Sequence, residues 1–358
     1  MENIEFKTPP CSPCLYGELY LFNMKIKTGI IGGAGYTAGE LIRLLINHPN
    51  VEISFVHSTS NAGNKITDVH GGLIGETNLI FTPQSPEGSQ KSPLGDLGVG
   101  DLGVDALFLC SAHGDSKKFM EENIIPENIK IIDLSTDYRN ESNGFVYGLP
   151  ELNKERIAVA TKVANPGCFA TAIELALLPL AANGLLQNEV QIFGQTGSTG
   201  AGVKPSETTH FSWRANNVSV YKAFEHQHLK EITQSIKQLQ GNFDKALNFI
   251  PFREGFTRGI FVVAHTDCFL SLNEIKSLYT KFYQNAAFTF ISDKNIDLKQ
   301  VVNTNKCILY LEKHDNKIMI ISIIDNLLKG ASGQAVHNMN LMFGLEEKTG
   351  LLLKPSAF

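Results

Sequence analysis

The sequence predicts an α/β protein with a doubly wound parallel sheet and a second, mixed-sheet α+β domain. Strand-like and helix-like segments alternate from Lys25 to about Pro166, which is typical of a parallel sheet with helical crossovers. Beyond Pro166 the strand-like segments alternate apolar and polar residues, as half-buried antiparallel strands do. The length of 358 residues suits two domains.

The composition indicates a globular protein that acts on small molecules. Hydrophobic residues make up 43% of the chain and charged residues 19%, which supports a large core. The net charge is −5 and the basic residues are scattered, so we expect no nucleic-acid partner. No apolar run reaches the roughly 18 residues of a membrane span. Six cysteines in so long a chain indicate reduced thiols and a cytoplasmic location.

Residues 1–24 are expected to form a disordered extension ahead of the first domain, or to follow a start codon placed upstream of the true one. Cys11 and Cys14 form a Cys-x-x-Cys pair there. No second such pair or His-x-x-His completes a zinc site, so no metal is expected. A metal or redox role for this pair is the alternative.

The first domain is expected to begin with a strand, a Gly-rich turn and an amphipathic helix. The stretch 82–105 interrupts the alternation that follows; it is rich in Pro, Gly and Ser, repeats GDLGV at 95–104, and is predicted to be an exposed loop without catalytic work. The expected strands are 26–31, 51–57, 106–110 and 130–134, and the helix carries Leu41, Ile42, Leu44 and Leu45 on one face.

The second domain is expected to hold a mixed sheet with helices on one face. The expected strands are 188–195, 246–251, 258–266, 306–312 and 317–324, and the expected helices are 226–240 and 272–286. A final helix at about 333–344 is expected to return to the first domain. The expected division is therefore 25–166 with 327–358 as the cofactor domain, and 167–326 as the catalytic and oligomerisation domain.

The segment GIIGGAGYTAGE at 29–40 predicts a dinucleotide site of the Rossmann type. Glycine allows a sharp turn and close approach of backbone amides to a pyrophosphate, and the following helix directs its positive end at the same phosphates. An ordinary tight turn is the alternative. The residues expected to contact the cofactor are Gly32, Gly33, Ala34, Gly35, Tyr36 and Thr37.

The end of the second strand favours NADP over NAD. An acidic residue there would bond the ribose 2′-hydroxyl and repel a 2′-phosphate, but the sequence is His-Ser-Thr-Ser-Asn at 57–61. Ser58 and Ser60 offer hydroxyl groups without negative charge. No arginine accompanies them.

Cys168 is the candidate nucleophile. In ANPGCFAT at 164–171, a Pro-Gly turn would deliver the thiol to the start of an apolar helix, and helix N-termini lower the pKa of a thiol. A small buried hydrophobic residue is the alternative, and it suits Cys110, Cys268 and Cys307.

The segment HQHLKE at 226–231 is the candidate proton-handling group. His228 and Glu231 are three residues apart on a predicted helix, so the carboxylate can orient the imidazole. His226 lies beside them. A structural histidine is the alternative. No third strong metal ligand accompanies this pair of histidines.

Two further segments suit anion binding. GQTGSTGAG at 194–202 offers amides and hydroxyls, including those of Ser198 and Gly200, and a flexible loop is its alternative. Arg258 opens the predicted strand 258–266 and is a candidate clamp for a carboxylate, with a surface ion pair as the alternative.

Several of these segments occur in one order in a known family. They are GGAGYTAGEL (32–41), SAHG (111–114), IDLSTDYR (132–139), YGLPEL (147–152), NPGCFAT (165–171), GSTGAG (197–202), HQHLKE (226–231), TRGI (257–260) and DNLLKGASGQAVHNMN (325–340). On these motifs the chain resembles the N-acetyl-gamma-glutamyl-phosphate reductases of arginine biosynthesis, which are related to aspartate-semialdehyde dehydrogenase. The likeness runs from about Lys25 to the C-terminus.

The resemblance implies an NADPH-dependent reductase that acts through a thioester on Cys168, assembled as a homodimer or homotetramer. It implies that His228 is the acid/base, with His226 and Glu231 in support. It also implies that Arg258 and Ser198 contact substrate and that Asn326 lies near the nicotinamide. A related reductase of aspartyl or aminoadipyl phosphate is the nearest alternative, and a non-catalytic NADP-binding sensor is another.

The chain departs from the family pattern at three places. Thr59 stands where many relatives have arginine, and Gln227 and Lys230 replace Arg and Pro in the histidine segment. The stretch between Arg139 and Tyr147 is shorter than in most relatives. The N-acyl group, acetyl or succinyl, is therefore left open.

Overall fold

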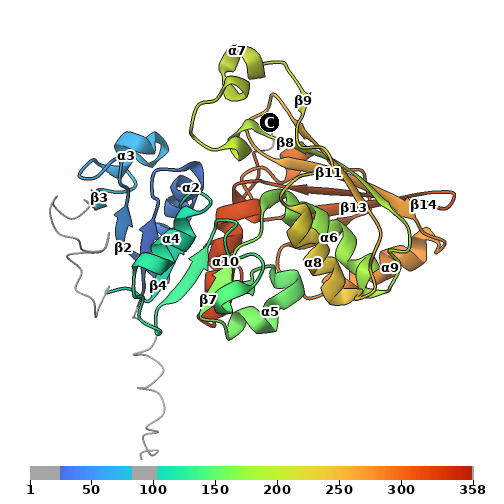
Figure 1. The fold of residues 1–358 in the computed structure, drawn as a ribbon, viewed down its shortest axis with the longest axis horizontal. Coiled ribbons are helices and arrows are strands. Elements are labelled where there is room, and N and C mark those ends of the chain that lie inside the picture. The colour runs from blue at the N-terminus through green and yellow to red at the C-terminus, as the bar shows by residue number, and fades with distance from the viewer. Residues whose placement is uncertain (1–24, 83–102, 357–358) are drawn as a thin grey trace, which may run out of the picture.

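The computed structural model describes residues 25–82 and 103–356, which form two seven-stranded sheets side by side (Figure 1). The expected extension at 1–24, with Cys11 and Cys14, lies outside the described residues, as does most of the 82–105 loop. In the described part of the chain, no helix is long and apolar enough to cross a membrane.

The first sheet is parallel throughout, in the order β3-β2-β1-β4-β5-β7-β6. The strand order reverses between β1 and β4, which is where doubly wound sheets bind ligands. Its strands are β1 (Ile26–Ile31), β2 (Val51–His57), β3 (Phe81–Thr82), β4 (Ala106–Leu109), β5 (Lys130–Asp133), β6 (Val146–Tyr147) and β7 (Lys162–Ala164).

Helices cover this sheet, and its strands are therefore buried and apolar. Ile30, Val56 and Phe108 are fully buried and pack with Leu41 and Ile42 of α2 in one core. The helices are α2 (Tyr36–Leu45), α3 (Ile66–Val69), α4 (Asp115–Glu122) and α5 (Pro150–Ala158), joined by the last helix, α10 (Gly333–Met342). Figure 1 shows α10 between the two sheets, and it packs against α2, α5 and β5.

The second sheet is mixed, in the order β12-β13-β14-β11-β8-β10-β9. The pairs β8/β10 and β12/β13 are parallel and the others antiparallel. Its strands are β8 (Val190–Thr196), β9 (Ser219–Val220), β10 (Leu247–Arg253), β11 (Ile260–Asp267), β12 (Thr289–Ser292), β13 (Cys307–His314) and β14 (Lys317–Ile324).

Three helices cover one face of the mixed sheet: α6 (Cys168–Ala182), α8 (Leu229–Leu239) and α9 (Leu272–Tyr283). α6 is buried almost throughout, which matches its continuous apolar sequence. Along β11, Ile260, Val262 and Ala264 face this core, while Phe261 and Val263 lie on the other face and are only half-buried. A small helix, α7 (Phe211–Arg214), projects from the sheet edge beside β9 (Figure 1).

The predicted fold class is confirmed, with corrections to single elements. The mixed sheet predicted for the second domain is observed, with β10 parallel to β8 and β11 antiparallel to it. The predicted helix at 226–240 begins only at Leu229. The residues before it form a turn, in which the amide of His228 donates to Nδ1 of His226 (3.3 Å). β12 was not predicted, and its four residues contain no clear alternation.

Candidate active site

The Gly-rich turn after β1 lies at the point where the strand order of the parallel sheet reverses. Gly32 has a φ of +81°, and a Cβ there would lie 2.8 Å from the backbone of Cys110. A Cβ on Gly33 would lie 2.3 Å from Val56 Cγ1. Gly35 precedes α2 with open space around its Cα and no side chain capping the helix. The free amides of Tyr36 and Thr37 are therefore open to an anion, which fits the pyrophosphate of a dinucleotide.

The polar residues after β2 form a small hydroxyl and amide cluster. Asn61 Nδ2 donates to Ser60 Oγ (2.9 Å), and the Oγ atoms of Ser58 and Ser60 are 3.5 Å apart. His57 ends the strand, and burial lowers its pKa. Neutral donors and acceptors stand here in place of the carboxylate that would repel a 2′-phosphate.

Cys168 is the first residue of α6, at the junction of the two sheets. Asn165 follows β7, and its backbone amide donates to the carbonyl of Asp133 at the end of β5 (2.7 Å). Its Nδ2 donates to the carbonyl of Ala331 (3.1 Å). Gly330 covers the cysteine from the other side, since a Cβ on Gly330 would lie 2.8 Å from Cys168 Cβ. The candidate nucleophile is thus held between the end of the parallel sheet and the turn that follows β14.

Cys168 is partly buried at the start of α6. Burial raises its pKa to about 11, although the Arg139 guanidinium and the backbone amide of Phe169 act in the opposite direction. The expected lowering by the helix start is therefore present but is outweighed by desolvation. Cys168 is a neutral thiol at neutral pH in this state.

Arg139 is the cation of the site, and its guanidinium is fixed by three acceptors. Nε donates to Asn165 O (2.9 Å), Nη2 to Leu134 O (3.3 Å) and Nη1 to Glu231 Oε1 (3.1 Å). The side chains of Arg139 and Glu231 are almost fully buried, at 10% and 5% exposed. Arg139 therefore places its positive charge near the thiol in a dry environment, paired with the Glu231 carboxylate.

His228 lies against the same ion pair. Its Nε2 is 3.8 Å from Glu231 Oε1, while its buried Nδ1 has no hydrogen-bond partner. Burial and then Arg139 hold the pKa of His228 well below its usual range, so the ring is neutral. A neutral ring with a free nitrogen can exchange a proton with a ligand.

His226 has a supporting position among aromatic rings. Its ring lies edge-on to Phe169 and Phe249, with centroid distances of 5.7 and 5.3 Å, and its Nδ1 accepts from the amide of His228. Burial lowers its pKa to about 4. His226 therefore acts on the position of His228 as a neutral acceptor.

Gly167 must be glycine for these groups to come together. A Cβ there would lie 2.5 Å from His228 Nε2 and 2.7 Å from Arg139 Nη1. Its amide donates to Glu231 Oε2 (3.0 Å). The turn that presents Cys168 is thus tied to the same carboxylate as Arg139.

The 198–201 turn lies next to Asn326. Asn326 accepts from the amide of Gly259 (2.7 Å) and donates from Nδ2 to Thr199 Oγ1 (3.0 Å). A Cβ on Gly200 would lie 4.0 Å from the same Nδ2. Ser198 begins this short helical turn, so the structure groups Ser198, Gly200 and Asn326 near one another.

Arg258 is occupied by two carboxylates. Nε and Nη2 donate to Asp325 (3.0 and 3.1 Å), and Nη1 donates to Glu40 Oε1 (2.6 Å). Glu40 belongs to α2, so this ion pair joins the parallel-sheet half to the mixed-sheet half. A ligand carboxylate that took the place of Glu40 would gain this bond from Nη1.

Several site residues were missed by sequence reasoning. Arg139 and Tyr147 belong to motifs that carried the resemblance, which was the available signal. Glu174 had no signal beyond being an acidic residue inside an apolar helix.

In the described residues no group of three or more His, Cys, Asp or Glu side chains could hold a metal ion.

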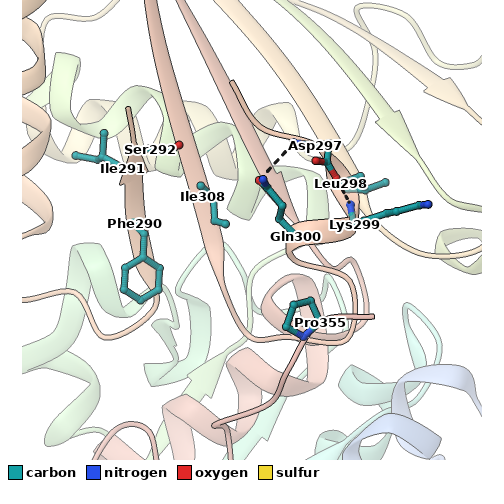
Figure 2. A pocket seen from close by; sticks show the side chains of 9 residues that line it. All are labelled: Phe290, Ile291, Ser292, Asp297, Leu298, Lys299, Gln300, Ile308 and Pro355. Atoms are coloured by element: carbon teal, nitrogen blue, oxygen red, sulfur yellow. Dashed lines mark hydrogen bonds between the residues drawn. The ribbon is translucent and has the colours of Figure 1, made fainter. Parts of the chain in front are cut away.

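An open groove on the mixed sheet contains none of these residues. It lies beside β12 and β13, between Phe290, Ile308, Leu298 and Pro355 (Figure 2). The dashed lines mark the bonds from the Lys299 amide to Asp297 and from the Asp297 amide to Gln300. The groove is continuous with the half-buried apolar face of the sheet.

Two family models match the chain, one in each half. The semialdehyde dehydrogenase NAD binding domain matches residues 27–160, and the semialdehyde dehydrogenase dimerisation domain matches residues 168–326. The second match begins at Cys168.

N-acetyl-gamma-glutamyl-phosphate reductases from several bacteria align with nearly the whole chain. N-acetyl-gamma-glutamyl-phosphate reductases from Parabacteroides distasonis and Bacteroides thetaiotaomicron are 62% and 61% identical over 335 residues, covering 93% of this chain and all of theirs. Among solved structures, aspartate semialdehyde dehydrogenase II from Vibrio cholerae aligns with a TM-score of 0.67 at 14% identity. It covers 90% of this chain and 99% of that one, and its likeness supports the fold alone.

Proposed function

The chain belongs to the N-acetyl-gamma-glutamyl-phosphate reductase family, and on this premise we propose that it reduces N-acetyl-L-glutamyl 5-phosphate to the 5-semialdehyde and phosphate in arginine biosynthesis. The observation that carries the proposal is the convergence of Cys168, Arg139, His228 and Glu231 at the junction of the two sheets. Such a set suits acyl transfer to a thiol followed by reduction.

In the first step, we propose that the sulfur of Cys168 attacks the γ-carbonyl carbon. A C–S bond forms, the C–O bond to phosphate breaks, and phosphate leaves. The thiol must first lose its proton, and the neutral imidazole of His228 is the group proposed to take it. Arg139 stabilises the thiolate. We propose that the amides in the first turn of α6, which face the thiol, stabilise an oxyanion.

In the second step, the thioester is reduced. NADPH, when bound, supplies the hydride. We propose that the Gly-rich turn at 32–37 holds its pyrophosphate, that Ser58 and Ser60 bond the 2′-phosphate, and that Ser198, Gly200 and Asn326 lie along the nicotinamide side. His228 returns its proton to the developing oxygen, which gives a thiohemiacetal. When the C–S bond then breaks, the hydroxyl proton passes back through His228 to the sulfur, and the aldehyde is released.

Arg258 is proposed to hold the α-carboxylate of the substrate. Nε and Nη2 bond Asp325, and Nη1, which bonds Glu40 of α2, is the atom proposed to exchange partners. The substrate carboxylate would therefore replace Glu40 at that atom.

Assembly is proposed to use the open face of the mixed sheet. This face carries half-buried apolar residues, which a monomer would leave in contact with water. A second copy packed on it would give a homodimer, and a pair of such dimers a homotetramer; light scattering of the purified protein would distinguish the two. We also propose a cytoplasmic location, which reduced cysteines suit.

A reverse-direction assay tests the reaction and its acyl group. Purified protein is given N-acetyl-glutamate semialdehyde, phosphate and NADP, and the absorbance of the reduced cofactor is followed. The N-succinyl analogue, the aspartate and aminoadipate semialdehydes, and NAD run in parallel. Phosphate-dependent reduction of NADP with the N-acetyl substrate is expected. Turnover only with another semialdehyde would overturn the substrate assignment while leaving the thiol chemistry in place.

A further inference from the structure

A buried hydrogen-bond network joins Glu231 to Tyr147, Glu174 and Ser235. Glu174 stands six residues after Cys168 on α6 and is fully buried. Tyr147 ends β6 with 1% of its surface exposed, and Ser235 lies one turn beyond Glu231 on α8. These side chains come from three elements and meet at one point.

The hydroxyl of Tyr147 touches both glutamates. It is 2.9 Å from Glu231 Oε2, and 3.0 and 3.1 Å from the two oxygens of Glu174. Ser235 Oγ donates to Glu174 Oε1 (2.7 Å). A tyrosine hydroxyl has one proton, so it can donate to only one of the two carboxyl groups.

The proton count requires one of the two carboxyl groups to be neutral. Glu231 has the cation, because it pairs with Arg139 and also accepts from the Gly167 amide. Glu174 forms no ion pair with any residue that the structure describes, and burial together with the nearby charge of Glu231 raises its pKa well above the usual range. With a proton on Glu174, that group donates to Tyr147 and Tyr147 donates to Glu231, so every member of the chain has a partner.

We propose that Glu174, as a neutral carboxylic acid, and Tyr147 are positioning residues that orient the ionised Glu231. Glu231 in turn fixes the Arg139 guanidinium and the Gly167 turn, and through them the thiol and His228. No bond forms or breaks in Glu174 or Tyr147 during turnover. The effect on catalysis rests on the proposed function, whereas the protonation of Glu174 can be measured without turnover.

Three variants separate the roles. Glu174→Gln keeps a neutral group that can donate to Tyr147 and accept from Ser235. Glu174→Met keeps the volume and removes both hydrogen bonds. Tyr147→Phe keeps the ring in the core and removes only the hydroxyl, so it carries the test even where Glu174→Met unfolds. Thermal unfolding of each variant identifies any loss of fold.

The kinetic readout is the split between kcat and KM. Glu174→Gln should retain kcat within about threefold, whereas Tyr147→Phe and Glu174→Met should lose roughly 10- to 100-fold in kcat with little change in KM for NADPH. The rescue by glutamine separates a neutral hydrogen-bonding role from a charged one. Equal losses in glutamine and methionine variants, or unchanged kcat in Tyr147→Phe, would overturn the proposal.

Two readouts need no substrate. The infrared difference between the native protein and Glu174→Gln at neutral pH should contain the C=O band of a protonated carboxyl group. The rate of Cys168 alkylation by iodoacetamide should follow the same pH dependence in both proteins, because no charge has been removed. A carboxylate band in place of the acid band, or a shift of the alkylation profile toward acid in Glu174→Gln, would show that Glu174 is ionised and overturn the proposal. A protein that passes these tests but fails to turn over would count against the proposed reaction and leave the protonation of Glu174 intact.

Discussion

Arg139 and Glu231 form a buried ion pair, with Nη1 and Oε1 3.1 Å apart, between residues that lie 92 positions apart in the chain. Arg139 follows the end of β5 in the parallel-sheet half, and Glu231 lies in α8 on the mixed sheet. The pair therefore joins the two halves at the thiol.

Replacing Arg139 by methionine should impair both stability and chemistry. The change leaves Glu231 buried without its cation, which costs about 3–5 kcal/mol in the free energy of unfolding. It also removes the charge that favours the Cys168 thiolate, so alkylation of Cys168 at fixed pH should slow. Chemical denaturation and iodoacetamide kinetics measure the two effects.

Arg156→Met is the matched control for Arg139→Met. Arg156 pairs with Glu141 at the surface with 47% of its side chain exposed, and such pairs contribute only about 0–1 kcal/mol. Equal destabilisation by the two changes would show that the Arg139 pair is solvated rather than buried.

Cys168 alkylation should rise steadily with pH. Because burial raises the thiol pKa to about 11, the thiolate fraction and the rate should grow about tenfold per pH unit from roughly pH 7 to 10, without a plateau. The same shift makes this group's contribution to stability complete below about pH 9 and progressively lost as the pH rises toward about 11. Peptide mapping assigns the adduct. A plateau near pH 7 would mean that the helix start and Arg139 outweigh burial.

Gly167→Ala should lower kcat without weakening cofactor binding. The new methyl group would lie 2.5 Å from His228 Nε2 and 2.7 Å from Arg139 Nη1, so both groups must move. A displacement of about 1 Å can cost roughly 100-fold in rate. Steady-state kinetics and NADPH titration measure the two quantities. Gly72→Ala is the control, because no heavy atom lies within 4 Å of a Cβ there, and it should leave kcat unchanged.

Arg258→Gln and Glu40→Gln should differ in their effect on substrate binding. Arg258→Gln removes the proposed carboxylate ligand and should raise KM for the acyl phosphate roughly tenfold or more. Glu40→Gln frees Nη1 of Arg258, so KM should stay the same or fall, while thermal stability drops slightly because the contact between the halves is lost. A similar rise in KM for both variants would indicate that Arg258 only joins the two halves.

The sequence predicted the long elements well because their patterns are local. The strands at 26–31 and 317–324 match β1 and β14 residue for residue, and α10 begins at the expected Gly333. β3, β6 and β9 contain two residues each, too few for any periodic pattern to appear. Their places in the sheets are set by neighbouring strands.

Local patterns also account for the part of the candidate site that the sequence predicts. Cys168 and the histidine segment have local signals, a Pro-Gly turn before a helix and an acidic residue three positions after a histidine. Tyr147 and Glu174 act through contacts between residues 27 and 84 positions apart, which no local pattern contains. The raised pKa of Cys168 likewise depends on burial under Gly330 and the α6 core, which only the packed structure contains.

The most direct test of the central claim is to trap the acyl group on Cys168. The protein is mixed with N-acetyl-glutamyl phosphate without NADPH, quenched in acid, and weighed by mass spectrometry before and after digestion. An N-acetyl-glutamyl adduct on the peptide with Cys168, absent in Cys168→Ser and retained in Cys110→Ser, is the expected result. An unmodified protein that still releases phosphate, or an adduct that persists in Cys168→Ser, would contradict the thioester mechanism.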